Sequence, residues 1–260
     1  MTWIYGIPVW VFSLCTVVAL CTITCVGHWL VLRSVPTRDF VKHNGVAGSI
    51  LGIIGTAYAV LLSFVVVVVW QQYNNSDNVV STEASAVSDL HRLSDALPSP
   101  LNVTLKTELD RYVSLMIYDE WPQMQHGGWS REAQHLARVI TRQVADVVPR
   151  NASQQNVQSQ ALGLVTTFLD ARRGRLHDNE TGIPWILWST LWCVAVVTLA
   201  FSYMFGVENV RIQLTMTGAL TLTIALMFIL IAELDYPFRG DTGISPHSWY
   251  QIQRQLHSDR

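Results

Sequence analysis

Four long segments of this chain contain no Asp, Glu, Lys or Arg, and they limit the possible fold more than any other feature. The segments are Ile7–Leu32, Gly45–Trp70, Ile183–Val207 and Ile212–Ala232. Each is long enough to cross the hydrocarbon core of a bilayer, which takes ~20 residues of helix. The first is longer than the apolar run of a signal peptide and follows no basic leader, so we expect it to be retained. The sequence therefore predicts an all-α membrane protein with four transmembrane helices.

The composition supports this class of protein. Only 14% of the 260 residues are charged, against roughly 25% in an ordinary soluble protein. The 17 Lys and Arg are balanced by 19 Asp and Glu, whereas a nucleic-acid binder needs a basic surface, so we expect no nucleic-acid partner. Ten Trp residues are typical of a protein with two membrane interfaces. All four Cys lie in the uncharged segments, and no disulfide framework, metal site or cofactor is predicted.

The uncharged segments divide the chain into four regions. Residues 1–70 are predicted to form a transmembrane hairpin, 71–182 a helical soluble domain, 183–233 a second transmembrane hairpin, and 234–260 a C-terminal tail. No Gly or Pro occurs between Gly55 and Pro98, and the second membrane helix is therefore expected to continue into the soluble domain as a rigid strut.

The soluble domain is predicted to contain three further helices. The first has Ser99 as its N-cap and runs to Trp121; the second begins at Ser130 and ends near Val148; the third ends near Leu176. The sequence contains no HExxH, no pair of CxxC motifs, no GxSxG and no Gly-rich phosphate loop, which are the spacings that bring catalytic groups together. We therefore expect that the protein is not an enzyme.

The second uncharged segment carries a strip of small residues. They recur every three or four positions, at Gly45, Gly48, Gly52, Gly55, Ala59 and Ser63. Such a strip is typical of close helix packing, which we assign to Gly48, Gly55 and Ala59. It is also suited to a pore, whose predicted lining is Gly52, Thr56, Val60, Ser63 and Phe64. Both interpretations hold together if several copies of this helix surround one axis.

Several motifs resemble the bestrophin-like family of bacterial membrane proteins. They are Ala57–Trp70, Glu83-Ala84, Tyr112, Glu120-Trp121-Pro122, Arg172-Arg-Gly-Arg-Leu176, Ile183-Pro184, Leu187-Trp188 and Asp235-Tyr-Pro-Phe-Arg-Gly240. Trp70-Gln-Gln-Tyr73 and Pro237-Phe238-Arg-Gly240 further resemble motifs of true bestrophins, which are pentameric anion channels. The resemblance implies an oligomeric, anion-permeable channel.

Two departures from true bestrophins bear on these expectations. Gly52 and Thr56 stand where the bestrophin neck has bulky apolar residues, so the resemblance implies a wider and wetter constriction here. The run of Asp that follows Pro-Phe-Gly in calcium-gated members is replaced by the single Asp241. Calcium gating is therefore not expected.

A second resemblance suggests a different function. Leu51-Gly-Ile-Ile-Gly-Thr-Ala57 is similar to a segment of the ExbB, TolQ and MotA stators, which use proton flow to drive a partner protein. In ExbB and TolQ that segment follows the cytoplasmic insert, whereas here it precedes it. A proton-channel stator and a structural or signalling membrane protein therefore stay as alternatives.

The charged residues near the membrane suggest two further sites. Arg172, Arg173 and Arg175 precede the third uncharged segment, where they would either attract anions into a vestibule or anchor the helix at lipid headgroups. Asp235 and Asp241 flank Phe238. We hypothesise that both Asp residues pair with these arginines while Phe238 fills an apolar gap, which clamps the tail to the soluble domain. The alternative is a solvated tail with Trp249 at the membrane interface.

The expected partners are further copies of the chain, the lipid bilayer and small inorganic ions. A pentamer is implied only by the resemblance. Basic residues near the membrane are divided equally, with Arg33, Arg38, Lys42 and Arg211 on one side and Arg172, Arg173, Arg175 and Arg239 on the other. This balance predicts no orientation, and the resemblance implies a bacterial inner membrane protein with a cytoplasmic soluble domain.

Overall fold

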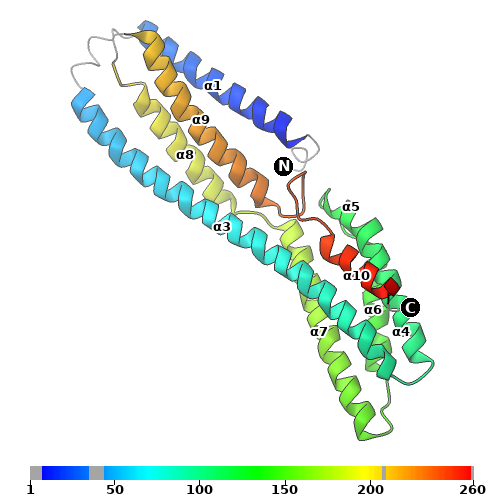
Figure 1. The fold of residues 1–260 in the computed structure, drawn as a ribbon. Coiled ribbons are helices and arrows are strands. Elements are labelled where there is room, and N and C mark those ends of the chain that lie inside the picture. Colours follow the sequence, from blue (N-terminus) through cyan, green and yellow to red (C-terminus); the bar gives the residue numbers. More distant parts are fainter. Residues whose placement is uncertain (1–7, 35–43, 207–208, 259–260) are drawn as a thin grey trace. The chain divides into compact units, whose positions relative to one another are not determined.

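The computed structural model describes residues 8–34, 44–206 and 209–258 (Figure 1). Every regular element in these residues is a helix, which confirms the predicted all-α class. The predicted loop between the first two membrane helices, with Pro36, falls largely outside the described residues, as does part of the turn between the last two.

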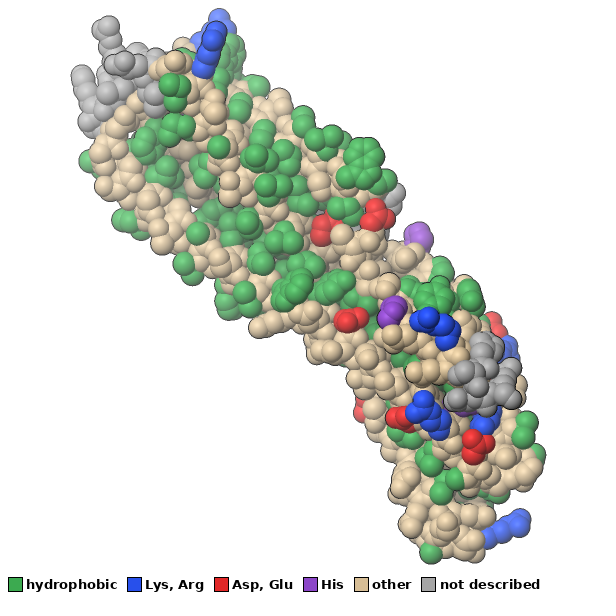
Figure 2. Space-filling view, in the orientation of Figure 1, with side chains coloured by type: hydrophobic (Ala, Val, Ile, Leu, Met, Phe, Trp, Pro, Cys, Tyr) green, Lys and Arg blue, Asp and Glu red, His purple; other side chains and the backbone are tan. Residues whose placement is uncertain are grey.

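The contacts divide the chain into two units. The membrane unit comprises Gly6–Gln71 and Ile183–Asp235, and the polar unit contains Gln72–Gly182 and Tyr236–Arg260. Hydrophobic side chains gather over the membrane unit in Figure 2, whereas most charged side chains lie on the polar unit. The C-terminal tail thus belongs with the polar insert, although the last two membrane helices separate them in the sequence.

The membrane unit is built from α1 (Val9–Ser34), the first half of α3 (Asn44–Leu93), α8 (Trp185–Ser202) and α9 (Val210–Asp235). By length and composition, four helices in the described residues could cross a membrane, as predicted. Helix α1 packs along α9. Polar side chains link these two helices: Thr24 contacts Thr221 at 3.0 Å between hydroxyl oxygens, and His28 Nδ1 lies 2.6 Å from Thr217 Oγ1.

Helix α3 is continuous over 50 residues, from Asn44 to Leu93. At 1.5 Å per residue it is about 75 Å long, more than twice the thickness of a hydrocarbon core. The absence of Gly and Pro after Gly55 removes the residues that would break it. The second membrane helix therefore continues beyond its apolar half into the polar unit, as predicted.

The polar unit contains the second half of α3 and a further set of helices. In chain order these are η2 (Ser94–Ala96), α4 (Leu101–Leu115), the π-helical turn η3 (Met116–Glu120), α5 (Trp121–Met124), α6 (Arg131–Ala145), α7 (Ala152–Glu180) and α10 (His247–Ser258). The predicted helix from Ser99 to Trp121 is therefore interrupted by one π-helical turn.

The helix ends agree only partly with the predictions. The N-cap of α4 is Pro100, with no side-chain hydrogen bond, so the predicted cap at Ser99 is wrong. Ser130 does cap α6, accepting a hydrogen bond from the Ala133 amide at 3.2 Å. Helix α6 ends at Ala145, before the expected Val148, and α7 continues to Glu180, beyond the expected Leu176.

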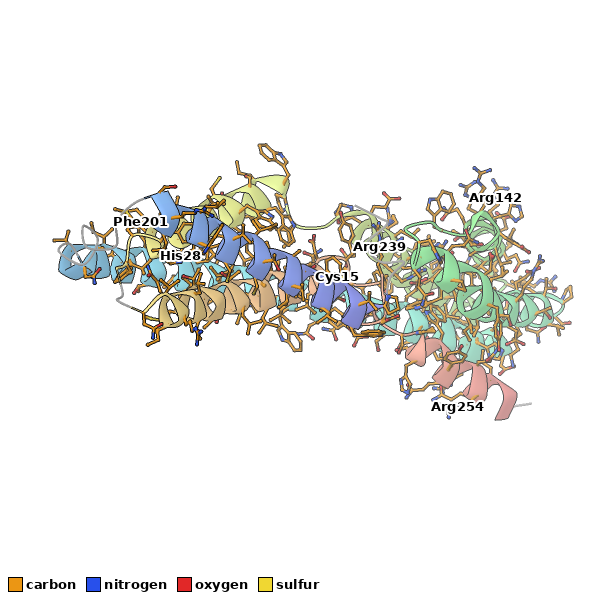
Figure 3. All side chains as sticks on the ribbon, turned by 90° about the horizontal axis from the view of Figure 1, so that it is seen from above. Cys15, His28, Arg142, Phe201, Arg239 and Arg254 are labelled. Atoms are coloured by element: carbon orange, nitrogen blue, oxygen red, sulfur yellow. The ribbon has the colours of Figure 1, made fainter. Side chains whose placement is uncertain are left out.

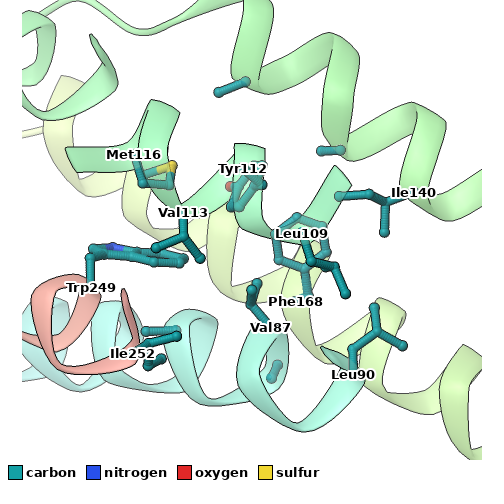
Figure 4. Close-up of a cluster of buried hydrophobic side chains, with 14 of the residues drawn as sticks. Val87, Leu90, Leu109, Tyr112, Val113, Met116, Ile140, Phe168, Trp249 and Ile252 are labelled. Atoms are coloured by element: carbon teal, nitrogen blue, oxygen red, sulfur yellow. The ribbon is translucent and has the colours of Figure 1, made fainter. Parts of the chain in front are cut away.

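A single hydrophobic core unites the helices of the polar unit (Figure 4). The Tyr112 ring lies edge-on to Phe168 at 5.0 Å and to Trp249 at 5.8 Å between centroids. Trp249 is completely buried. The alternative that placed Trp249 at the membrane interface is therefore wrong, since α10 supplies part of this core.

The segment before α10 also packs into the polar unit. Phe238 is 1% exposed and lies 5.8 Å from the Trp121 ring, edge to face. The Trp121 indole donates a hydrogen bond to the Ile244 carbonyl at 3.1 Å.

Arg239 donates a hydrogen bond to the Asn179 carbonyl at 2.9 Å, and a Cβ on Gly127 would come within 2.8 Å of the Arg239 guanidinium. Gly127 has a φ of 78°, a conformation that other residues rarely adopt, so its turn favours glycine.

We expect Phe238→Ala to destabilise the polar unit by about 3–5 kcal/mol, because it removes a buried aromatic ring and leaves a cavity against Trp121. Urea unfolding of the full chain in detergent, followed by tryptophan fluorescence, measures the change. Tyr250→Ala, at a half-exposed ring of α10, is the matched control and should shift stability by no more than about 0.5 kcal/mol. Equal effects of both substitutions would contradict the assigned packing of Phe238.

Candidate functional site

Within the membrane unit, α3 has one packed face and one open face. The packed face is formed by buried side chains at helical spacing, namely Ala47, Tyr58, Leu62, Val65 and Val69. On the other side of the helix, all five predicted pore-lining residues are exposed: Gly52, Thr56, Val60, Ser63 and Phe64. We call these five residues the open face of α3.

Hydroxyl groups recur along this side of α3. Ser49, Thr56 and Ser63 are seven residues apart, and each donates a hydrogen bond to the carbonyl oxygen four residues earlier, at 3.0, 2.8 and 2.8 Å. A spacing of seven residues is close to two helical turns, so the three hydroxyls form a line along the helix. The open face therefore presents a row of hydroxyl oxygens beside the apolar Val60 and Phe64.

The glycines of the strip have different surroundings. A Cβ on Gly48 would lie 3.7 Å from the Phe205 ring, so Gly48 faces a neighbour in the same chain. A Cβ on Gly52 or Gly55 would meet no atom of the described chain within 4 Å, and Ala59 is exposed. Of the predicted packing positions, Ala59 is therefore exposed, and Gly55 is half-buried with room for a Cβ.

The polar unit contains a buried ion cluster. Arg172 makes two hydrogen bonds to the Glu120 carboxylate, both of 2.8 Å. Arg175 bridges the carboxylates of Glu83 and Glu120, at 2.5 Å and 2.8 Å. None of these four side chains is more than 2% exposed. The cluster connects α3, η3 and α7, and its two positive charges balance its two negative charges.

Tyr112 of α4 completes the buried ion cluster. Its hydroxyl donates to Glu83 at 2.7 Å and accepts from Arg172 at 2.7 Å. Burial, together with Glu83, raises the pKa of Tyr112 well above its usual value of 10.0, so the phenol stays protonated and keeps donating. Burial lowers the pKa of Arg175, but Glu83 and Glu120 outweigh burial and raise it overall. Every member of the cluster thus has a partner for its buried charge or hydroxyl.

These contacts correct the predicted roles of the three arginines. Arg172 and Arg175 are buried and neutralised, so they neither attract anions into a vestibule nor reach lipid headgroups. Arg173 is exposed and pairs with Asp170. The acidic partners of the three arginines are thus Glu83, Glu120 and Asp170, whereas the clamp hypothesis assigned Asp235 and Asp241 to them.

Asp235 has a different role inside the membrane unit. Its carboxylate accepts hydrogen bonds from the Ile183 amide at 2.5 Å and from the Trp188 indole at 3.2 Å. It thereby ties the end of α9 to the start of α8. Of the three residues assigned to the clamp, Phe238 is the one that the structure places in the hydrophobic core of the polar unit.

The sequence interpretation missed two polar clusters. The pairing of Glu83 and Glu120 with the arginines joins residues that are 52 to 92 positions apart. The second cluster includes His28, which is completely buried in the membrane unit and lies 3.0 Å from Gln213 as well as near Thr217 (Figure 3). An available signal was His28 itself, an ionisable residue inside an uncharged segment.

The four apolar helices and the inserted helical unit define an integral membrane protein. A comparison with protein families matches the Bestrophin-like domain to residues 18–249. The chain belongs to the Bestrophin-like family, which confirms the resemblance seen in its motifs. No curated protein matches the sequence.

Solved structures support the same fold. The chain is similar to a bacterial bestrophin homolog from Klebsiella pneumoniae, with 13% identity, a TM-score of 0.68, and coverage of 93% of this chain and 97% of that one. A mutant of that homolog gives 13% identity, a TM-score of 0.69, and coverage of 93% and 98%. At this identity the likeness establishes the fold.

We expect Glu120→Gln to destabilise the polar unit by about 3–5 kcal/mol, because it leaves Arg172 and Arg175 buried with too little negative charge. The free energy of unfolding in urea gives the measurement. Glu132→Gln is the control, since Glu132 forms an exposed pair with Arg111 that contributes at most about 1 kcal/mol. A loss for Glu120→Gln no larger than the control's would contradict the buried ion cluster.

Proposed function

We propose that this protein is an oligomeric, bestrophin-type ion channel that conducts anions through a pore lined by the open face of α3. The observation that carries the proposal is the row of small and hydroxyl residues that no other part of the described chain covers. Membership of the Bestrophin-like family also supports an ion channel.

An oligomer follows from the character of the open face. Glycine in a helix costs about 1 kcal/mol relative to alanine, and membrane helices use it where another backbone approaches closely. Gly52 and Gly55 have no such neighbour in the described chain. Copies of α3 arranged around an axis would place a neighbouring helix against these glycines and would also enclose a pore. The family resemblance favours five copies.

Anion permeation is consistent with the groups on this face. It carries neither carboxylates nor basic side chains. The hydroxyls of Thr56 and Ser63 can turn from their helix carbonyls and donate to a passing anion. Gly52 and Thr56 also leave room for the ion to keep part of its water, which lowers the cost of dehydration. We place the protein in a bacterial inner membrane with the polar unit in the cytoplasm.

Flux through liposomes tests this function. Purified protein should pass chloride or nitrate without a partner, and Thr56→Phe should reduce the flux to background because each copy adds a ring to the constriction. Val196→Phe is the matched control: it adds the same ring at an exposed apolar position of α8 and should leave the flux unchanged.

Other outcomes of this experiment would favour the alternatives. Proton flux that needs a second protein would identify a stator. No flux of either kind, from protein that is folded and oligomeric, would leave a structural or signalling role. A monomeric mass in nanodiscs would overturn the shared pore.

A further inference from the structure

An open hollow of about 420 Å³ lies between helices α6 and α7 of the polar unit. Its lining includes four arginines, with Arg138 and Arg142 from α6 and Arg172 and Arg173 from α7, and no carboxylate. In Figure 3 the Arg142 side chain extends outward from α6. This volume falls in the usual range for small-molecule sites, about 300–1,000 Å³.

The four arginines of the hollow differ in whether an acidic side chain neutralises their charge. Arg172 is neutralised by Glu120, and Arg173 pairs with Asp170 at the surface. Arg138 and Arg142 have no hydrogen-bond or ion-pair partner in the described chain. They stand one turn apart on α6, and two like charges at that spacing repel each other. Both side chains are exposed, so solvent screens part of this repulsion, and a bound anion would offset the rest.

A polar side chain of the lining is also oriented as a donor. Gln134 accepts a hydrogen bond from Arg172 Nε at 3.3 Å through its side-chain oxygen, and this leaves its amide NH2 group to donate. Arg172 is itself fixed by its two bonds to Glu120. Leu169 and Leu176 supply apolar wall. The hollow therefore combines guanidinium and amide donors with a hydrophobic side.

We propose that this hollow is a binding site for a phosphate-bearing anion. Guanidinium groups match the oxygens of a phosphate with paired hydrogen bonds, and the volume is far larger than a halide ion needs. The apolar wall accommodates the organic part of the ligand. A soluble organic phosphate and a phospholipid headgroup share this chemistry. Binding in this hollow is a property of the polar unit, and it can be measured separately from ion conduction.

Binding is tested with the full chain, purified in detergent and stripped of lipid. Calorimetric titration with pyrophosphate should show saturable binding, and the double variant Arg138→Gln, Arg142→Gln should weaken it at least about tenfold, because it removes two guanidinium groups that would donate to the anion. Arg150→Gln is the control, because Arg150 is exposed and lies outside the hollow; it should leave the affinity unchanged.

A second titration identifies the source of the phosphate. Short-chain phosphatidylglycerol is added below its micelle concentration to the same variants. Tighter, arginine-dependent binding of pyrophosphate supports a soluble phosphate, and tighter, arginine-dependent binding of the lipid supports a headgroup. Failure of both probes to bind, or equal weakening by Arg150→Gln and the double variant, would overturn the proposal.

Discussion

The buried ion cluster of Glu83, Glu120, Arg172 and Arg175 is the interaction on which the polar unit depends. Removing a charge from water costs several kcal/mol, and the cost is recovered only when an opposite charge and enough hydrogen bonds meet it in a fixed geometry. Four charges and the Tyr112 hydroxyl satisfy one another here. Because the partners lie on three helices and a π-helical turn, the cluster specifies how those elements meet.

Much of the fold could be predicted because its signals are local. Membrane helices are marked by the absence of charge, and the length of α3 follows from the absence of Gly and Pro after Gly55. The ion cluster could not be predicted in the same way. Arg172 and Arg175 occupy a stretch rich in charged residues just before a membrane segment, and the sequence does not specify whether such residues face lipid headgroups or buried acids. The π-helical turn η3 could not be predicted, because no side-chain pattern is typical of a π-helix.

The candidate site was predicted in part because helical spacing alone determines which residues share a face. The spacing placed Gly52, Thr56 and Ser63 together, and the structure leaves them exposed. The sequence does not predict which element packs against them, because a glycine that packs within one chain and a glycine that packs between copies occur in the same pattern. Gly48 and Gly52 illustrate this: they are one turn apart, and only Gly48 has a neighbour within the described chain.

The division of the polar unit into two stretches of sequence has a consequence for biosynthesis. Trp249 and Phe238 belong to its core, yet they are translated after the last two membrane helices. While those helices are being inserted, the insert already exists outside the membrane with the surfaces for both aromatic rings uncovered. The core can close only after the segment that carries Phe238 and Trp249 has been made. A chain that stops before Tyr236 would thus expose the apolar surface that these rings cover, and chaperones and proteases recognise such exposed apolar surface.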